Sequence, residues 1–332
     1  MNWLVNTLTA SLFALALSAC SDSAQQADPD FTPQNTERSF LSDNSPVVFI
    51  DEAHHNFLTM NGRFRPFTQV LQSDGYTVKA SKVAFSAAHL NQADILVIAN
   101  ALDKHRADWN PPFGNALTMQ EVTVVTEWVK QGGALFLVAD HTPFPKVIEN
   151  LTHALGFEFS HGHVGNAQFT THDNTLAQHA ITLAIVPALR KLPGAASMTG
   201  FGLTGAVGGA ASAAATDQST GQIEQVRSFG GSAFKAPEGA ISLLTLGPQA
   251  MSVNPQVPFQ ITADTPRMSV DGWSQGAVLE LGKGRVAVFA EGMMFSSQVD
   301  TQSGEKYGLA SEGAEHNEGF LLNVMGWLAN AE

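Results

Sequence analysis

The chain has 332 residues, of which 44% are hydrophobic, and this is enough for one large domain or two small ones. Its formal net charge is −13 at pH 7, and its 17 Lys and Arg residues are scattered singly along the sequence. An acidic surface without a basic patch repels phosphate backbones, so we expect no nucleic-acid partner.

The first nineteen residues have the pattern of a secretory signal, an apolar stretch that ends in small residues and is short for a membrane span. The closing residues Leu17-Ser18-Ala19-Cys20 resemble the bacterial lipobox, in which a lipid is attached to the Cys and the preceding segment is removed. Cys20 is the only cysteine of the chain, so it is the predicted lipidation site and the mature protein can form no internal disulfide.

The lipobox resemblance implies a location as well. Ser21 follows the modified Cys, and in enterobacterial sorting a Ser there favours the outer membrane. We therefore expect a protein of the bacterial cell envelope, attached to the membrane by its lipid and facing the periplasm from the outer membrane. The alternatives are an ordinary secretory signal and an uncleaved anchor. The start of the signal lacks Lys and Arg, which departs from the usual pattern.

Residues 20–45 are polar, contain prolines and have few large apolar groups. Such a segment buries too little apolar surface to fold by itself, so we predict a flexible tether. The folded part is expected to be one domain over residues 46–330.

From Pro46 onward, short apolar runs alternate with stretches of helical spacing, the pattern of an open α/β sheet with mostly parallel strands and helices on both faces. The predicted strands are 46–51, 76–80, 93–100 and 134–140, and the predicted helices are 65–75, 118–133 and 142–156. Thr118 and Glu121 have the spacing of a capping box, and Thr142 with Pro143 suggests a second helix start.

The second half of the chain has a different pattern. Residues 276–292 read as two strands joined at Gly282-Lys283-Gly284, which predicts an antiparallel hairpin, and residues 317–332 read as a terminal amphipathic helix. Between the halves, residues 192–221 are rich in Gly, Ala, Ser and Thr. They are either a disordered insertion or a mobile flap over a site.

Three predicted strands end in polar clusters, and ligands of open α/β sheets bind at the carboxyl ends of the strands. Carboxylates and imidazoles at one edge can bind a divalent metal or perform acid–base chemistry. If the protein has a cofactor, we expect it to be such a metal. The plain alternative is that each residue caps a turn. We predict as catalytic Asp51, His54, His141 and Glu291; as ligand-binding Glu52, His55, Asn56 and Asp140; and as metal ligands His54, His141 and Asp51.

Two motif matches are rejected. Asp51-Glu52-Ala53-His54 is spelled like the box of a DEAH helicase, but the phosphate-binding loop that such a motor needs is absent upstream. Gly272-Trp-Ser-Gln-Gly276 matches the hydrolase elbow G-x-S-x-G, with Asp300 and His316 in the expected order. However, Ser274 precedes a strand-like run rather than a helix.

A second histidine group lies at His161, His163 and His172, followed by Asp173. On a strand, His161 and His163 would point to the same face, as a metal site requires. A solvated loop rich in histidine is the alternative.

Several long phrases resemble an uncharacterised bacterial family of class I glutamine-amidotransferase-like domains, related to trehalose-utilisation proteins. They cover most of residues 46–330, with 183–235 poorly matched, and include "FIDEAHHNFLTMNGRFRPF", "WVKQGGALFLVADHTPFP" and "GKGRVAVFAEGMMFSSQ". The resemblance implies a flavodoxin-like fold. The amidotransferase nucleophile is a Cys after a central strand, where this chain has Asp140-His141, so glutaminase activity is not implied.

Two functions remain open. The first is a binding module for a small polar ligand, a sugar or cell-wall fragment, at the strand edge. The second is a hydrolase, with or without a divalent metal, that uses the Asp, His and Glu residues of the same edge. A structural role in an envelope complex is a third, weaker hypothesis.

Overall fold

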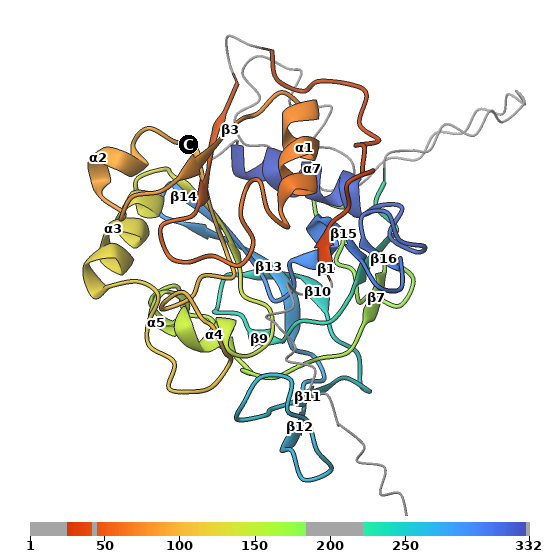
Figure 1. Ribbon diagram of the computed structural model, residues 1–332. Coiled ribbons are helices and arrows are strands. Elements are labelled where there is room, and N and C mark those ends of the chain that lie inside the picture. Colours follow the sequence, from red (N-terminus) through yellow and green to blue (C-terminus); the bar gives the residue numbers. More distant parts are fainter. Residues whose placement is uncertain (1–24, 42–44, 184–221, 330–332) are drawn as a thin grey trace, which may run out of the picture.

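A nine-stranded sheet forms the centre of the computed structural model, which describes residues 25–41, 45–183 and 222–329. The strand order is β3-β2-β4-β5-β14-β13-β9-β6, with β10 paired to β13 (Figure 1). Five neighbouring strands are parallel: β3 (Thr77–Ser81), β2 (Val47–Asp51), β4 (Ile95–Ala99), β5 (Ala134–Val138) and β14 (Gly284–Phe289). The protein is thus a mixed α/β fold around a mostly parallel sheet.

The remaining strands of this sheet are antiparallel: β13 (Ser274–Leu281), β10 (Ile241–Thr245), β9 (Phe234–Lys235) and β6 (Glu158–Phe159). β13 and β14 pair from Gly276↔Phe289 to Leu281↔Gly284. Gly282 turns the chain with φ +66°, and a Cβ there would lie 2.5 Å from the Lys130 carbonyl oxygen. The close approach of this turn to the backbone of Lys130 therefore requires glycine.

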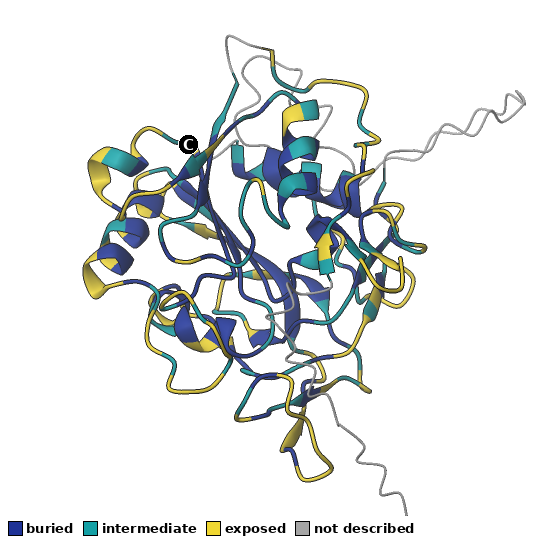
Figure 2. Ribbon diagram, in the orientation of Figure 1, coloured by how far each residue is buried: buried dark blue, intermediate teal, exposed yellow. Residues whose placement is uncertain are grey.

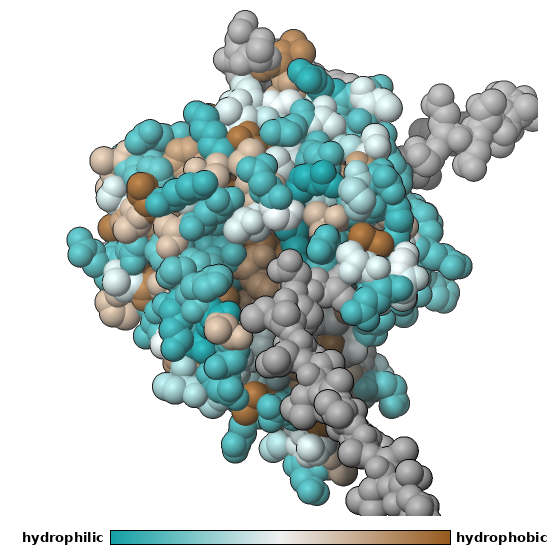
Figure 3. Space-filling view, viewed as in Figure 1, coloured by the Kyte–Doolittle hydropathy of each residue, from teal (hydrophilic) through white to brown (hydrophobic). Residues whose placement is uncertain are grey.

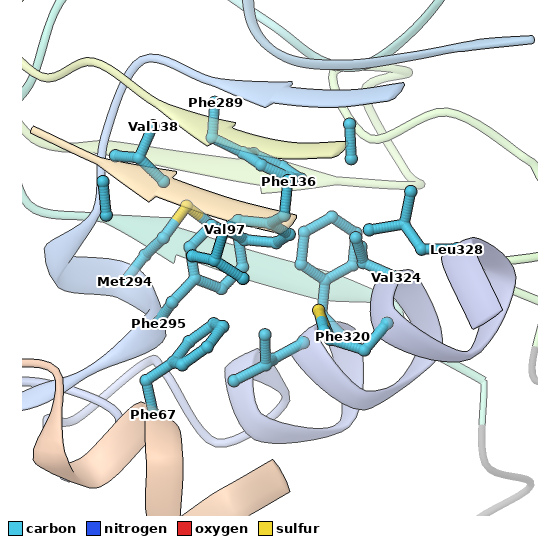
Figure 4. Close-up of a cluster of buried hydrophobic side chains, with 14 of the residues drawn as sticks. Phe67, Val97, Phe136, Val138, Phe289, Met294, Phe295, Phe320, Val324 and Leu328 are labelled. Atoms are coloured by element: carbon cyan, nitrogen blue, oxygen red, sulfur yellow. The ribbon is translucent and has the colours of Figure 1, made fainter. Parts of the chain in front are cut away.

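The central strands are apolar because both of their faces are covered. β4 and β5 are buried at every position, as expected for the middle of a parallel sheet. On one face, α1 (Arg65–Ser73) and the terminal α7 (Asn317–Ala329) pack against the sheet, where Phe136, Phe289 and Phe320 form an aromatic centre (Figure 4).

The other face is covered by α2 (Ala87–Leu90), α3 (Met119–Lys130), α4 (Phe144–Val147) and α5 (Glu149–Ala154). These helices are buried toward the sheet and exposed outward (Figure 2). The predicted capping box of α3 is present, with the Thr118 side chain and Glu121 bonded to each other's backbone. The helix predicted at 142–156 is instead two short helices, α4 and α5, which meet at Ile148 outside helical geometry. Pro143, not Thr142, occupies the N-cap position of α4.

Helices cover only the parallel part of the sheet, so the predicted regular arrangement of helices on both faces does not extend over the whole sheet. Beyond β14, the first face is covered by a two-stranded sheet of β7 (Ala167–Thr170) and β8 (Gln225–Ser228), whose Phe169 and Val226 join the core. A second small hairpin, β11 (Met251–Val253) with β12 (Arg267–Ser269), projects from the lower end in Figure 1.

The prediction of a flexible tether is wrong for residues 25–41. β1 (Gln25–Ala27) pairs with β15 (Ser297–Asp300), which also pairs with β16 (Lys306–Gly308). Asp28 is buried and forms an ion pair with Lys306 at 2.9 Å, and Phe31 enters the core. The segment is ordered by long-range partners that its own composition does not reveal.

Two other predicted features fall outside the described residues: the signal with Cys20, and the Gly/Ala-rich stretch 192–221. Within the described part of the chain, no helix is long and apolar enough to cross a bilayer. The face in Figure 3 is largely hydrophilic, with its hydrophobic residues in small, separate patches.

The docking of the N-terminal segment can be tested by a matched pair of substitutions. Phe31→Ala removes a side chain that is 8% exposed, whereas Leu41→Ala removes one that is 75% exposed. We expect Phe31→Ala to lower the free energy of unfolding by about 2–4 kcal/mol and Leu41→Ala by less than about 0.5 kcal/mol, as measured by urea denaturation. Equal, negligible effects would mean that the segment is a free tether.

Candidate functional site

The parallel strands end at one edge of the sheet, which we call the rim. The register pairs Asp51 with Ser81, Ala99 with Val138, and Val138 with Phe289. Each strand is followed by polar groups, so Asp51, Asn100, Asp140 and Glu291 come from successive strands across the rim. They form two separate clusters rather than one.

The first cluster, which we call the His54 cluster, consists of Asp51, His54 and Glu121. The Nδ1 atom of His54 lies 2.9 and 3.0 Å from the two carboxylate oxygens of Asp51, and its Nε2 atom lies 3.0 Å from Glu121 Oε1. All three side chains are largely buried, and the His54 ring packs against Phe85 with 4.6 Å between centroids. His54 therefore joins the end of β2 to the first turn of α3.

Both nitrogens of His54 face a carboxylate, so both must donate and the ring must be an imidazolium. Burial alone would lower the pKa of His54, but the hydrogen bonds and charges of Asp51 and Glu121 outweigh it and raise the pKa. Burial would likewise raise the pKa of Glu121, but hydrogen bonds from Thr118, His54 and Phe85 lower it to about 2. The cluster is thus a charged group of three side chains whose hydrogen bonds hold the end of β2 against the start of α3.

This geometry corrects the roles predicted for His54 and Asp51. An imidazolium has no lone pair for a metal or a substrate proton, and both oxygens of Asp51 are engaged by His54. His141 belongs to the second cluster, so the predicted metal set of His54, His141 and Asp51 is not assembled. Among the described residues, no group of three or more His, Cys, Asp or Glu side chains has the arrangement to hold a metal ion.

The second cluster, which we call the Asp140 corner, consists of Asn100, Asp140, His141 and Glu291. Asn100 donates from Nδ2 to Asp140 Oδ2 at 2.8 Å and accepts the Asp140 backbone N–H at 3.0 Å. The two-point contact fixes the orientation of the amide. Asn100 reaches it with a left-handed backbone, φ +52°, a conformation that Asn tolerates better than most residues.

Asp140 and Glu291 are two neighbouring carboxyl groups in a dry environment. Burial and the charge of Asp140 raise the pKa of Glu291 to about 8. The backbone N–H groups of Met293, Met294 and Phe229 act in the opposite direction, because their hydrogen bonds to the carboxylate lower this pKa. Burial also raises the pKa of Asp140, against the stabilising effects of His141, Asn100 and Gly292. Two close carboxyls resist sharing two negative charges, so the pair retains one proton at neutral pH.

His141 and His163 stack at this corner with 4.4 Å between ring centroids and an angle of 16°. His141 Nδ1 lies 2.8 Å from the Thr142 carbonyl, to which it must donate, so in the neutral ring Nε2 is left as an acceptor. Burial, together with the neighbouring His141, lowers the pKa of His163 to about 4, so His163 is neutral. Phe259, which is 58% exposed, packs edge-on against His141.

Three predicted ligand-binding residues lie in the loop after β2. Glu52 accepts the Met60 N–H at 3.0 Å and lies 3.7 Å from Lys82, and His55 is exposed with φ +50°. Asn56 is buried and donates to the Ala99 carbonyl at 3.4 Å, while its Oδ1 atom has no hydrogen-bond partner among the described residues. Asn56 Oδ1 is thus the buried polar atom of this loop that lacks a partner in the described structure.

The second histidine group does not converge. His161 lies 3.2 Å from Glu149, His163 stacks on His141, and Asp173 binds the hydroxyls of Thr170 and Thr175. The residues 161–163 are not on a regular strand, because His161 has φ +55°. Ser274 lies within β13 and donates to Ser242, in agreement with its rejection as an elbow nucleophile.

Two residues at these clusters were not predicted. Asn100 could have been found, because it occupies the same strand-end position as Asp51 and Asp140. Glu121 was recognised as a helix cap, but its contact with His54 spans 67 positions of sequence and depends on how α3 packs beside β2.

The fold and the rim define an open α/β domain of the class that binds ligands at strand carboxyl ends. No protein-family model matches the chain, and no curated protein is significantly similar in sequence. The solved structure of an "mmIFT52 N-terminal domain" superimposes with a TM-score of 0.53 at 13% identity, covering 86% of this chain and 98% of that one. This similarity shows a shared fold.

Two other solved structures overlap more loosely. The cytoplasmic protein STM1381 from Salmonella typhimurium LT2 has a TM-score of 0.43 at 13% identity, covering 85% of this chain and 98% of its own. A putative ThuA-like protein from Bacteroides uniformis has a TM-score of 0.40 at 9% identity, covering 86% and 92%.

The charged state of the His54 cluster predicts a pH-dependent stability. The folded pKa of His54 is raised above 6.5, so its stabilisation is complete below pH 6.5 and is lost as the pH rises through the folded value. We expect His54→Gln to cost about 2–4 kcal/mol at pH 6 and distinctly less at alkaline pH, as measured by urea denaturation. The exposed His105→Gln serves as the control. A cost for His54→Gln that does not change with pH would contradict the imidazolium.

Proposed function

We propose that the protein is a lipid-anchored protein of the bacterial envelope whose degenerate amidotransferase-like domain binds a small polar ligand, a sugar or a cell-wall fragment, at the Asp140 corner. The lipobox at Cys20 supports the anchor, its Ser21 supports the outer membrane, and the sequence phrases at the strand ends support the amidotransferase-like, flavodoxin-like family.

One observation carries the proposed site. Asp140 Oδ1 is buried and has no hydrogen bond of normal geometry among the described residues, where the Gly292 backbone N–H makes only a weak contact with the carboxylate, although Oδ2 is held by Asn100. Leaving a buried acceptor unpaired costs about 1–3 kcal/mol, more when it is charged. A group that donates a hydrogen bond to Oδ1 would recover this free energy, and the fixed position of the carboxylate makes its recognition specific.

The unpaired acceptors near the strand ends support a ligand rich in hydroxyl groups. Asn56 Oδ1, in the loop whose amide bonds to Ala99, and Gln275 Oε1, in the residue that accepts the Ala290 N–H, are also buried and without partners in the described structure. His141 adds its Nε2 lone pair in the neutral state, and the exposed ring of Phe259 adds an apolar surface beside it. Sugars present hydroxyl donors along their edges and C–H groups on their faces, so they match both features.

A second function, a hydrolase without a metal, is favoured by the proton shared between Asp140 and Glu291. With a pKa of about 8, Glu291 keeps its proton at neutral pH and can donate it to a leaving group. Asp140 could then accept a proton from an attacking water. The backbone N–H groups of Met293 and Met294 hold the Glu291 carboxyl in place for this role.

One experiment on residues 25–332 distinguishes ligand binding from hydrolysis. The protein is screened by thermal shift against monosaccharides and peptidoglycan fragments, and each mixture is then analysed for products by mass spectrometry. We expect a stabilising ligand whose affinity falls at least about tenfold in Asp140→Asn and is unchanged in Asp271→Asn, an exposed control. Product formation that disappears in Glu291→Gln would establish the hydrolase.

The absence of any shift across both panels would refute the binding function. A ligand that binds Asp140→Asn as tightly as the unmodified protein would place the site elsewhere.

A further inference from the structure

A cleft of about 570 Å³ is lined at one end by His163, the residue that stacks on His141 of the Asp140 corner. Its volume lies in the range of small-ligand pockets. One wall is residues 163–169, which lead into and include most of β7, and the other wall is residues 245–251, which lead into β11. Apart from His163, which also stacks on His141, neither wall belongs to the rim, so the cleft is a separate feature.

The cleft exists because two antiparallel segments pair at both ends and separate between them. At one end, His163 and Val253 exchange backbone hydrogen bonds of 2.8 and 2.9 Å. At the other end, the Thr245 N–H donates to the Thr175 carbonyl at 2.8 Å, next to the bridge of Leu176 with Leu244. The two segments thus leave a slot between them that is bounded by β pairing at both ends.

One wall of the slot is a free strand edge. Among the described strands β7 pairs only with β8. Thr170 directs its backbone away from β8, because its N–H bonds to Thr175 Oγ1 and its carbonyl accepts from Leu176. In an antiparallel pair this orientation repeats at every second residue, so Gln168 also turns its N–H and C=O away from β8 and toward the slot. An extended chain can pair with these groups as an added strand.

The slot has opposite charges at its two ends. Arg267 pairs in register with Val253, which places it at the His163 end, and its guanidinium forms no ion pair with a described residue. Asp173 lies at the Thr175 end. Hydrogen bonds from Thr175 and Thr170 lower the pKa of Asp173 to about 2, so its carboxylate is charged at neutral pH.

We propose that this slot binds a short peptide with free termini, which adds to the edge of β7 as an antiparallel strand. The peptide carboxylate lies at Arg267 and its amino group lies at Asp173. With this polarity the peptide runs opposite to β7, which is the favoured direction for strand pairing. The edge from Gly165 to Phe169 accommodates about four or five residues at about 3.3 Å each.

The test measures backbone hydrogen exchange at residues 165–170 of the intact protein by mass spectrometry. The probe is an equimolar mixture of tetrapeptides with free termini, built from Ala, Val, Thr, Ser and Leu and supplied at millimolar concentration. We expect exchange in this segment to slow about tenfold, with little slowing by the same mixture amidated at its C-terminus. Arg267→Gln should abolish the difference between the two mixtures, whereas Lys283→Gln, the same loss of charge at the β13–β14 turn, should preserve it.

Unchanged exchange with the free-termini mixture would overturn the proposal, and so would equal slowing by both mixtures or undiminished slowing in Arg267→Gln. The proposal is independent of the sugar or cell-wall ligand at the Asp140 corner. Its readout is on β7, and Asp140→Asn should leave it unchanged, so the two can fail separately.

Discussion

Parallel strands that end at one edge impose the main constraint on this molecule. β2, β4, β5 and β14 run in register, so the polar residues that follow them are brought together above an apolar sheet. A buried polar or charged group is costly unless it is bonded, and each strand end must therefore find a partner. The buried polar groups of the rim are fully hydrogen-bonded in the His54 cluster and only partly so at the Asp140 corner.

We infer from this difference that the His54 cluster serves the fold and that the Asp140 corner is the candidate site. In the His54 cluster every nitrogen and oxygen of the central contact is used, and the result joins the end of β2 to the start of α3. At the Asp140 corner one carboxylate oxygen has no hydrogen bond of normal geometry among the described residues, a second carboxyl retains a proton, and the imidazoles of His141 and His163 stack beside them. Buried polar groups that lower the stability of the fold in this way are typical of sites that act on or bind another molecule.

Local patterns predicted much of the fold. Continuous apolar runs identified the buried strands β4 and β5, and the spacing of Thr118 and Glu121 identified the start of α3. The pairing of Gln25 with Asp300 was beyond such patterns, because it joins segments that are distant in sequence. The same limit made His54 look like a catalytic residue: its neighbours in sequence are polar, but its decisive partner, Glu121, comes from a helix that packs beside it.

The shared edge of the polar strand ends was predicted, but the bonding among their side chains was not. The polar strand ends do lie on one edge, because parallel strands leave no alternative, but sequence could not tell which residues would bond each other. Asp51 and Asp140 look alike as the final residues of apolar runs. Only the structure distinguishes them, since Asp51 meets His54 with both oxygens and Asp140 meets Asn100 with one.

The central claim is that Asp51 is held for structure and Asp140 for function. It is tested most directly by comparing the free energies of unfolding of Asp51→Asn and Asp140→Asn with that of the unmodified protein at pH 7 in urea. We predict that Asp51→Asn costs about 2–4 kcal/mol, because it leaves a buried imidazolium without its partner. Asp140→Asn should be neutral within about 0.5 kcal/mol or stabilising, because it relieves the repulsion with Glu291. A loss in Asp140→Asn as large as that in Asp51→Asn would contradict the claim.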